Sequence, residues 1–249
     1  MFFAVVILYP FLINGDNRLS SRTDIEKNKM VFDRFEQDGD NHSMTNVQNI
    51  LLDDAFDLSD DEKIAIIQEY FKNIMLTLGL DLNDDSMRGT PYRVAKMYVN
   101  EIFKGINPKS RPEISLFDNK YQYGKMLIEK NISLYSFCEH HFLPFYGTVD
   151  VAYISTGKVI GLSKIHRIVN YFAKRPQVQE RLTIQIFNEL KEILNTEDVA
   201  LLIDATHLCV SSRGIKDVTS STVTIEAGGV FKNKEKWSNF TSIVGRNKG

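Results

Sequence analysis

Residues that bind zinc or move protons are concentrated in one short segment, Cys138-Glu139-His140-His141. In a tight turn or a first helical turn, residues three apart face the same way, so Cys138 and His141 can bind one ion. His140 then points elsewhere and is free for proton transfer. Because a catalytic zinc keeps about three protein ligands and leaves one position for water, this segment predicts two ligands of such a site.

The third ligand should be another cysteine or histidine, and the chain has only two cysteines and five histidines. The second cysteine, Cys209, lies in an apolar, β-branched run at 199–210 that predicts a buried strand. On a strand, residues two apart lie on one face, so we expect His207 and Cys209 to point together. The pattern favours a metal site made of Cys138, His141 and Cys209. The alternative is that these residues fill the core or that the cysteines form a disulfide.

A second group of side chains could hold an anion. Ser163 and Lys164 open a predicted helix directly after a strand, where free N–H groups and the helix dipole attract negative charge. Arg167 lies one turn further on, and Arg213 follows the second cysteine by a short loop. Together they would suit a polyphosphate, although each alone is more often a cap or a surface charge. Arg93, on another predicted helix, has the pattern of a solvated surface charge.

Composition limits the function classes. The chain has 249 residues, 43% of them hydrophobic and 25% charged, which are ordinary values for a globular protein. Its net charge of −2 argues against nucleic acid or an anionic membrane as a partner. Two cysteines make no disulfide framework and favour a cytoplasmic setting. The apolar start is shorter than the ~20 residues that span a bilayer, so no membrane anchor is expected, with a targeting segment as the alternative.

The predicted elements divide the chain into three regions. Residues 1–58 have no core pattern and are expected to form a mobile arm. Residues 59–110 form a helical region, with a capping box at Ser59 and a helix start at Thr90-Pro91. Residues 111–249 hold predicted strands at 126–137, 146–154, 199–210 and 218–227, and predicted helices at 163–174 and 176–194. Strands, two helices and strands again predict an α+β domain, an antiparallel sheet with helices on one face.

Several long motifs resemble GTP cyclohydrolase I, in that family's order and spacing, over about residues 60–231. The matching stretches are Thr90-Pro91-Tyr92-Arg93-Val94-Ala95-Lys96-Met97, Cys138-Glu139-His140-His141, Gly161-Leu162-Ser163-Lys164-Ile165-His166-Arg167-Ile168-Val169, Arg175-Pro176-Gln177-Val178-Gln179-Glu180-Arg181-Leu182-Thr183, and His207-Leu208-Cys209 with Arg213-Gly214. The resemblance implies a tunnelling fold (T-fold), in which subunit sheets join into a barrel and two pentamers stack as a D5 homodecamer with active sites at subunit interfaces. It also implies hydrolysis of GTP to 7,8-dihydroneopterin triphosphate and formate, the first step of pterin and tetrahydrofolate biosynthesis.

The resemblance also assigns roles to individual residues. It implies that Cys138, His141 and Cys209 bind Zn²⁺ and that His140 and His207 transfer protons. Substrate binding would fall to the remaining matched residues: Glu180 and Gln179 at the guanine edge, Ser163 at the ribose, and Lys164, Arg167, Arg213 and Arg93 at the triphosphate. It places Arg93 across a subunit boundary, which replaces the surface-charge interpretation.

This chemistry suits the residues themselves. Attack on C8 of a purine needs a strong nucleophile, and zinc lowers the pKa of bound water from about 15.7 to about 7. Histidine, with a reference pKa of about 6.5, can deliver the proton that C8–N cleavage needs. A carboxylate can accept from N1–H and the amine of guanine together, which adenine does not offer.

Two alternatives are weighed against this reading. One is a T-fold nitrile reductase of queuosine synthesis, which uses a nucleophilic cysteine and NADPH without zinc. The Cys138, His141 and Cys209 set argues against it. The other is a non-catalytic, zinc-stabilised binding protein, in which His140 and Glu180 need not coexist with a phosphate-binding cluster.

Overall fold

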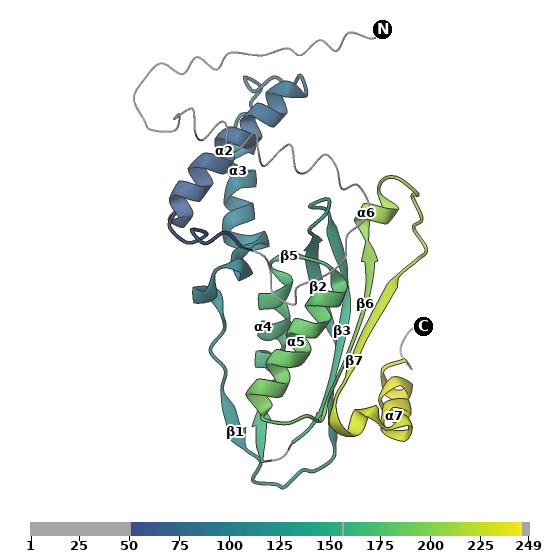
Figure 1. Cartoon of the computed structure of the whole chain (residues 1–249). Coiled ribbons are helices and arrows are strands. Elements are labelled where there is room, and N and C mark those ends of the chain that lie inside the picture. The colour runs from purple at the N-terminus through teal and green to yellow at the C-terminus, as the bar shows by residue number, and fades with distance from the viewer. Residues whose placement is uncertain (1–50, 156, 246–249) are drawn as a thin grey trace. The chain divides into compact units, whose positions relative to one another are not determined.

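The computed structural model describes residues 51–155 and 157–245 (Figure 1). The chain divides into two units, Met1–Thr45 and Asn46–Gly249, and the second contains every predicted site residue. The expected mobile arm falls mostly on residues 1–50, which lie outside the described residues.

The first described helix, α2 (Asp60–Thr77), begins at the predicted capping box. The Ser59 hydroxyl accepts from the Glu62 N–H at 3.3 Å, and the Ser59 N–H donates to the Glu62 carboxylate at 2.8 Å. The helix is capped at its C-terminus by Leu78, before Gly79 with a φ of +81°. This left-handed conformation is one that glycine adopts without strain.

The second helix, α3 (Thr90–Met97), is capped by Gly89 and not by Thr90, one residue earlier than predicted. The Gly89 carbonyl accepts from the Arg93 N–H at 3.1 Å, which closes the first helical turn. The helix runs on into a π-helical turn, η1 (Tyr98–Ile102), and then into the 3₁₀ turns η2 (Lys104–Ile106) and η3 (Pro108–Ser110).

The central feature is a five-stranded sheet with strand order β5-β2-β3-β6-β7. Four strands pair antiparallel, as predicted: β2 (Met126–Cys138), β3 (Pro144–Ile154), β6 (Val199–His207) and β7 (Thr222–Ala227). The fifth, β5 (Pro176–Gln177), pairs in parallel with the end of β2, so the sheet is mixed. A separate two-stranded ribbon joins β1 (Leu116–Asp118) to β4 (Lys158–Ile160).

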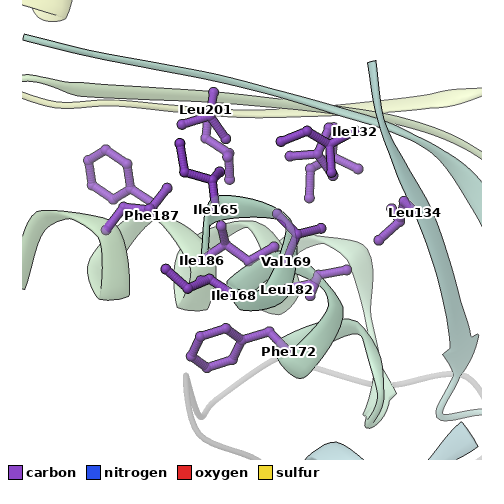
Figure 2. Packing of buried hydrophobic residues seen from close by; sticks show 14 of the residues in the cluster. Ile132, Leu134, Ile165, Ile168, Val169, Phe172, Leu182, Ile186, Phe187 and Leu201 are labelled. Atoms are coloured by element: carbon purple, nitrogen blue, oxygen red, sulfur yellow. The ribbon is translucent and has the colours of Figure 1, made fainter. Parts of the chain in front are cut away.

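Two helices, α4 (Leu162–Ala173) and α5 (Gln179–Leu194), lie together on one face of the sheet (Figure 1). Figure 2 shows their apolar side chains meeting those of the strands, and Ile165, Ile186 and Leu201 are fully buried there. The α+β prediction with helices on one face is confirmed. Helix α5 starts later than predicted because Pro176–Gln177 pairs with β2 as a strand.

The opposite face of the sheet is covered by η4 (Gly229–Lys232) and α7 (Lys234–Gly245), which the sequence analysis did not predict. Phe231 and Phe240 pack there with Ala200 of β6. Ala200 faces α7 while its neighbour Leu201 faces α4 and α5, because side chains alternate across a strand. The two apolar clusters therefore share one sheet.

The predicted strand at 199–210 is too long. Strand β6 ends at His207, and the next residues form a single helical turn, α6 (Leu208–Ser211). The ladder with β3 ends where His207 pairs with Phe145, so the chain beyond has no strand partner and closes a helical bond from the Ser212 N–H to the Leu208 carbonyl. The expectation that His207 and Cys209 share one strand face is therefore wrong.

Within residues 51–155 and 157–245, the helices are all too short or too polar to cross a bilayer.

Candidate metal centre and active site

One cysteine and one histidine of the β2–β3 connection meet a cysteine of α6. The ligand atoms of Cys138, His141 and Cys209 all lie within 4.8 Å of one another. The prediction that these residues come together is confirmed, although Cys209 reaches the cluster from a helical turn and not from a strand. Two sulfurs and one imidazole at this spacing could bind a metal ion.

The geometry of the β2–β3 connection explains how two of the ligands converge. The Cys138 N–H donates to the Leu143 carbonyl at 2.9 Å, and the Phe142 N–H donates to the Cys138 carbonyl at 2.8 Å. Phe142 reverses the chain with a φ of +52°. The tight connection brings His141 back over Cys138, while the β3–β6 register places α6 beside both.

The two cysteine sulfurs of the cluster influence each other. Burial, followed by the nearby Cys138 sulfur, raises the pKa of the Cys209 thiol above its usual range. Two thiolates in contact would repel each other, and a divalent cation between them would offset that repulsion. Arg213 donates from Nη1 to His141 Nε2 at 2.8 Å. Metal binding through that nitrogen would release the guanidinium of Arg213 for an anionic ligand.

His207 is held in one orientation at the edge of the cluster. Its ring stacks on Phe145 with centroids 4.7 Å apart, and its Nε2 lies 2.8 Å from Gln179 Oε1. The Gln179 amide nitrogen donates to the Thr222 carbonyl at 2.9 Å and to Thr224 Oγ1 at 3.0 Å, which fixes its oxygen toward the ring. His207 Nε2 therefore carries the proton, and Nδ1 is the basic nitrogen. Burial lowers the pKa of His207, while the charge of Glu180 opposes this effect.

His140 lies beside the cluster without being one of its three members. Its side chain is 38% exposed, and its Nδ1 is 3.8 Å from the Cys138 sulfur. Its ring stands nearly perpendicular to that of His141, at 86°, with centroids 6.5 Å apart. The two adjacent histidine rings thus differ in orientation.

Sequence reasoning missed an ion pair beneath this turn. Arg181, in the first turn of α5, donates to both carboxylate oxygens of Glu139. The sequence does carry a signal for it, since an arginine in the first turn of a helix opposes the helix dipole and calls for a compensating anion.

The predicted phosphate-binding residues of α4 are not brought to the cluster. Ser136 donates to the Ala173 carbonyl at 2.8 Å. The end of α4, and not its start, therefore lies near residues 138–142, which carry two of the candidate ligands and are called the metal-binding turn below. Ser163 is about 15 Å further along the helix, at roughly 1.5 Å per residue. Cys138 lies about 7 Å beyond Ser136 along β2, in the direction that leads away from Ser163. Ser163 and Arg167 are exposed, and Lys164 donates to the Glu113 carbonyl at 2.8 Å.

Arg93 lies near the start of α3 and contacts its own helix and the preceding loop. Its Nη2 donates to the Ser86 carbonyl at 3.0 Å and to Thr90 Oγ1 at 2.8 Å. None of the hydrogen bonds that the structure gives it within the described ranges reaches the metal cluster.

The fold and the site together define an α+β protein with a three-residue candidate metal site and further histidines beside it. Residues 67–244 match the family model described as GTP cyclohydrolase I. The chain is 59% identical over 212 residues to GTP cyclohydrolase 1 of Flavobacterium johnsoniae, covering 85% of this chain and 95% of that relative. It is 53% identical over 177 residues to GTP cyclohydrolase 1 of Aeromonas salmonicida, covering 71% of this chain and 81% of that relative. The chain belongs to the GTP cyclohydrolase I family.

A weaker likeness links the chain to a solved structure of the archaeosine synthase QueF-like in its apo form. The match covers 42% of this chain and 95% of that one, with 18% identity and a TM-score of 0.34. This is too distant to bear on the site.

Proposed function

We propose that this protein is an enzyme that hydrolyses GTP to 7,8-dihydroneopterin triphosphate and formate, the first step of pterin and tetrahydrofolate biosynthesis. The observation that carries the proposal is the Cys138, His141 and Cys209 cluster, with ligand atoms within 4.8 Å. It occurs in a chain similar to GTP cyclohydrolase 1 of F. johnsoniae over 95% of that relative.

Zn²⁺ is the metal that the donor set fits best. Two cysteines and one histidine match the ligands of a catalytic zinc that keeps one position open. Bound there, zinc would supply a Lewis acid and a water molecule acidic enough to attack C8 at neutral pH. The chain's own residues would hold the ion and provide the proton transfers.

His140 and His207 divide the proton transfers between them. His207 stays neutral at neutral pH because burial lowers its pKa, and its Nδ1 is free to take a proton. Gln179 prevents the ring from turning, which keeps that nitrogen in place. His140 is the more exposed of the two and lies beside Cys138, where it would deliver a proton to a purine nitrogen.

Guanine would be read at the first turn of α5. Glu180 is exposed there, and its carboxylate can accept from the N1–H and the amine of guanine together. The side-chain amide of Gln179 is buried and committed to His207, Thr222 and Thr224. Gln179 would therefore contribute to guanine binding through its backbone N–H at the open helix start and through its hold on His207.

The triphosphate would be bound by two subunits. Arg213 is already beside the cluster of its own chain. Ser163, Lys164 and Arg167 lie about 16–22 Å away along the backbone, by the helix and strand rises given above, so we infer that a neighbouring copy presents them. Arg93 would come from a neighbour as well. We infer a homo-oligomer with shared active sites, assembled as a D5 decamer in a closed tunnelling-fold barrel that pairs the exposed sheet edges.

We place the enzyme in the cytoplasm, because both cysteines must stay reduced to bind the metal. In this proposal residues 59–110 form an N-terminal helical region and residues 111–249 the catalytic T-fold domain. We expect residues 1–58 to take no part in the reaction.

The test is GTP turnover by metal-loaded protein before and after treatment with a chelator, with formate and the pterin product both quantified. We expect turnover that is lost with the metal and restored by adding Zn²⁺, and no formate from ATP. Metal-free protein that oxidises NADPH with a nitrile substrate would instead identify the nitrile reductase. Stoichiometric zinc without any formate would identify a non-catalytic binding protein.

A further inference from the structure

We propose that Arg181 and Glu139 are positioning residues: their ion pair locks the metal-binding turn onto the first turn of α5. This inference rests on the proposed function, since it assumes that the cluster binds a metal. Neither residue belongs to the candidate ligand set, and neither is one of the proposed proton-transfer or substrate-binding groups.

The pair has the geometry of a strong, directed contact. Arg181 Nη2 donates to Glu139 Oε1 at 3.0 Å, and Nη1 donates to Oε2, so the guanidinium holds both carboxylate oxygens. Only 7% of the Arg181 side chain and 29% of the Glu139 side chain are exposed. A planar bidentate pair fixes orientation as well as distance, which a single contact does not.

The position of Arg181 in the chain makes a nearby anion favourable. Arg181 is the third residue of α5, where the positive end of the helix dipole disfavours a cation. Burial of its side chain adds a desolvation cost that only a close anion offsets. The Glu139 carboxylate meets both needs, because it neutralises the guanidinium and also lies at the favourable end of the dipole.

A backbone contact ties the same two segments together. The Glu139 N–H donates to the Gln177 carbonyl at 3.0 Å, and Cys138 pairs with Gln177 in the β2–β5 register. Gln177 is fully buried and donates to the Gln185 side chain at 2.8 Å. The turn is thus attached to β5 by its backbone and to α5 by the ion pair.

The first turn of α5 therefore holds two parts of the site at once. Gln179 orients His207, and Arg181 orients the residue between the metal ligand Cys138 and His140. Without Arg181, the Glu139 carboxylate would be left partly buried and only 3.9 Å from His140 Nε2. It would then compete for His140 and free the turn to move, so both the metal site and its neighbouring histidine would lose their positions.

The experiment compares metal binding by the full chain and its variants, using Zn²⁺ in chelator competition and Co²⁺ for its visible spectrum. Arg181→Met removes the charge but keeps much of the side-chain volume, and Arg181→Lys keeps the charge but not the two-pronged contact. We expect Arg181→Met to weaken metal binding by about 10- to 100-fold and to change the Co²⁺ spectrum, as losing a partner outside the ligand shell does. Arg181→Lys should recover only part of the loss, and Glu139→Gln should not add to it in the double variant.

Arg111→Met is the matched control. Arg111 also holds a glutamate of α5, with its Nε and Nη2 at 2.9 and 2.7 Å from Glu189 Oε1, but it lies outside the metal-binding turn. It should leave metal affinity and the Co²⁺ spectrum unchanged.

Wild-type metal affinity and an unaltered spectrum in both Arg181→Met and Glu139→Gln would overturn the positioning role, even if thermal stability fell. If Arg181→Met does not fold, Arg181→Lys and Glu139→Gln decide the question by the same two readouts. A wild-type chain that binds neither metal would refute the proposed metal centre itself, which is a separate result.

Discussion

The two ends of α4 differ in how their polar residues are held. Near its last residue, Ala173, the metal-binding turn and the start of α5 form a dense set of contacts, in which His207, Gln179 and Arg181 each have defined partners in the same chain. Near its first residues, Ser163 and Arg167 are exposed on the helix surface.

The two ends of α4 would therefore serve different purposes, one for the reaction and the other for binding the substrate. Folding of one chain is sufficient to bring together the candidate metal ligands and the two histidines proposed to transfer protons. In the proposed function, the triphosphate is bound by the other end of α4, which another subunit presents to the cluster. In this account, the reactive half of the site is a product of folding and the phosphate-binding half is a product of assembly.

The largest expected effect is at the metal end. Cys138→Ser, His141→Ala and Cys209→Ser should each lose both stoichiometric metal and all turnover, because a three-ligand site cannot spare one ligand. Metal analysis and GTP turnover on the same preparations check this. His166→Ala is the control, since that histidine pairs with Glu129 outside the cluster. Full metal occupancy in any of the three variants would remove that residue from the ligand set.

His140→Ala separates proton transfer from metal binding at the candidate metal site. The variant should keep its metal and lose turnover by roughly 10²- to 10⁴-fold, the usual contribution of general acid–base groups. Metal content and kcat, measured together, separate this outcome from a loss of the site. Wild-type rates would show that His140 is structural.

Arg167→Ala tests the proposed role of the N-terminal end of α4 in GTP binding. Metal content should stay unchanged while kcat/KM for GTP falls by roughly 10- to 100-fold, since a hydrogen bond to a charged group contributes about 1.5–3 kcal/mol. Lys120→Ala, which removes another exposed charge, should have no such effect. A loss of metal in Arg167→Ala would mean that the two ends are not independent.

The smallest effect is expected from shortening the chain. Removing residues 1–45 should leave metal content and turnover unchanged, because every proposed site residue lies in the unit Asn46–Gly249. Loss of activity or of the oligomer in the shortened chain would assign these residues a part in assembly.

Local signals in the sequence predicted the local features well. The capping box at Ser59 starts α2 as expected, and the three-residue spacing of Cys138 and His141 places both in one cluster. The end of β6 was missed because an apolar run of this kind cannot distinguish a strand from a strand followed by one helical turn. Strand pairing, which a single segment does not reveal, decided that boundary.

Other features depend on contacts between distant segments. The Arg181–Glu139 pair forms only when β5 aligns α5 with the turn, and the separation of Ser163 from the cluster follows from the direction in which α4 crosses the sheet. Helix α7 did have a signal, since Trp237, Phe240 and Val244 recur at helical spacing, but it was not among the predicted elements.

Subunit mixing tests whether each active site is shared between two subunits. His140→Ala and Arg167→Ala, each carrying a different affinity tag, are co-expressed, and oligomers that retain both tags are assayed for GTP turnover. If the site is shared between subunits, about one site in four receives both intact residues under random mixing in a closed ring. We expect recovery to about a quarter of wild-type activity, although each variant alone is nearly inactive or binds GTP poorly. No recovery in oligomers shown to contain both variants would place Arg167 and His140 in the same chain's site and contradict the account.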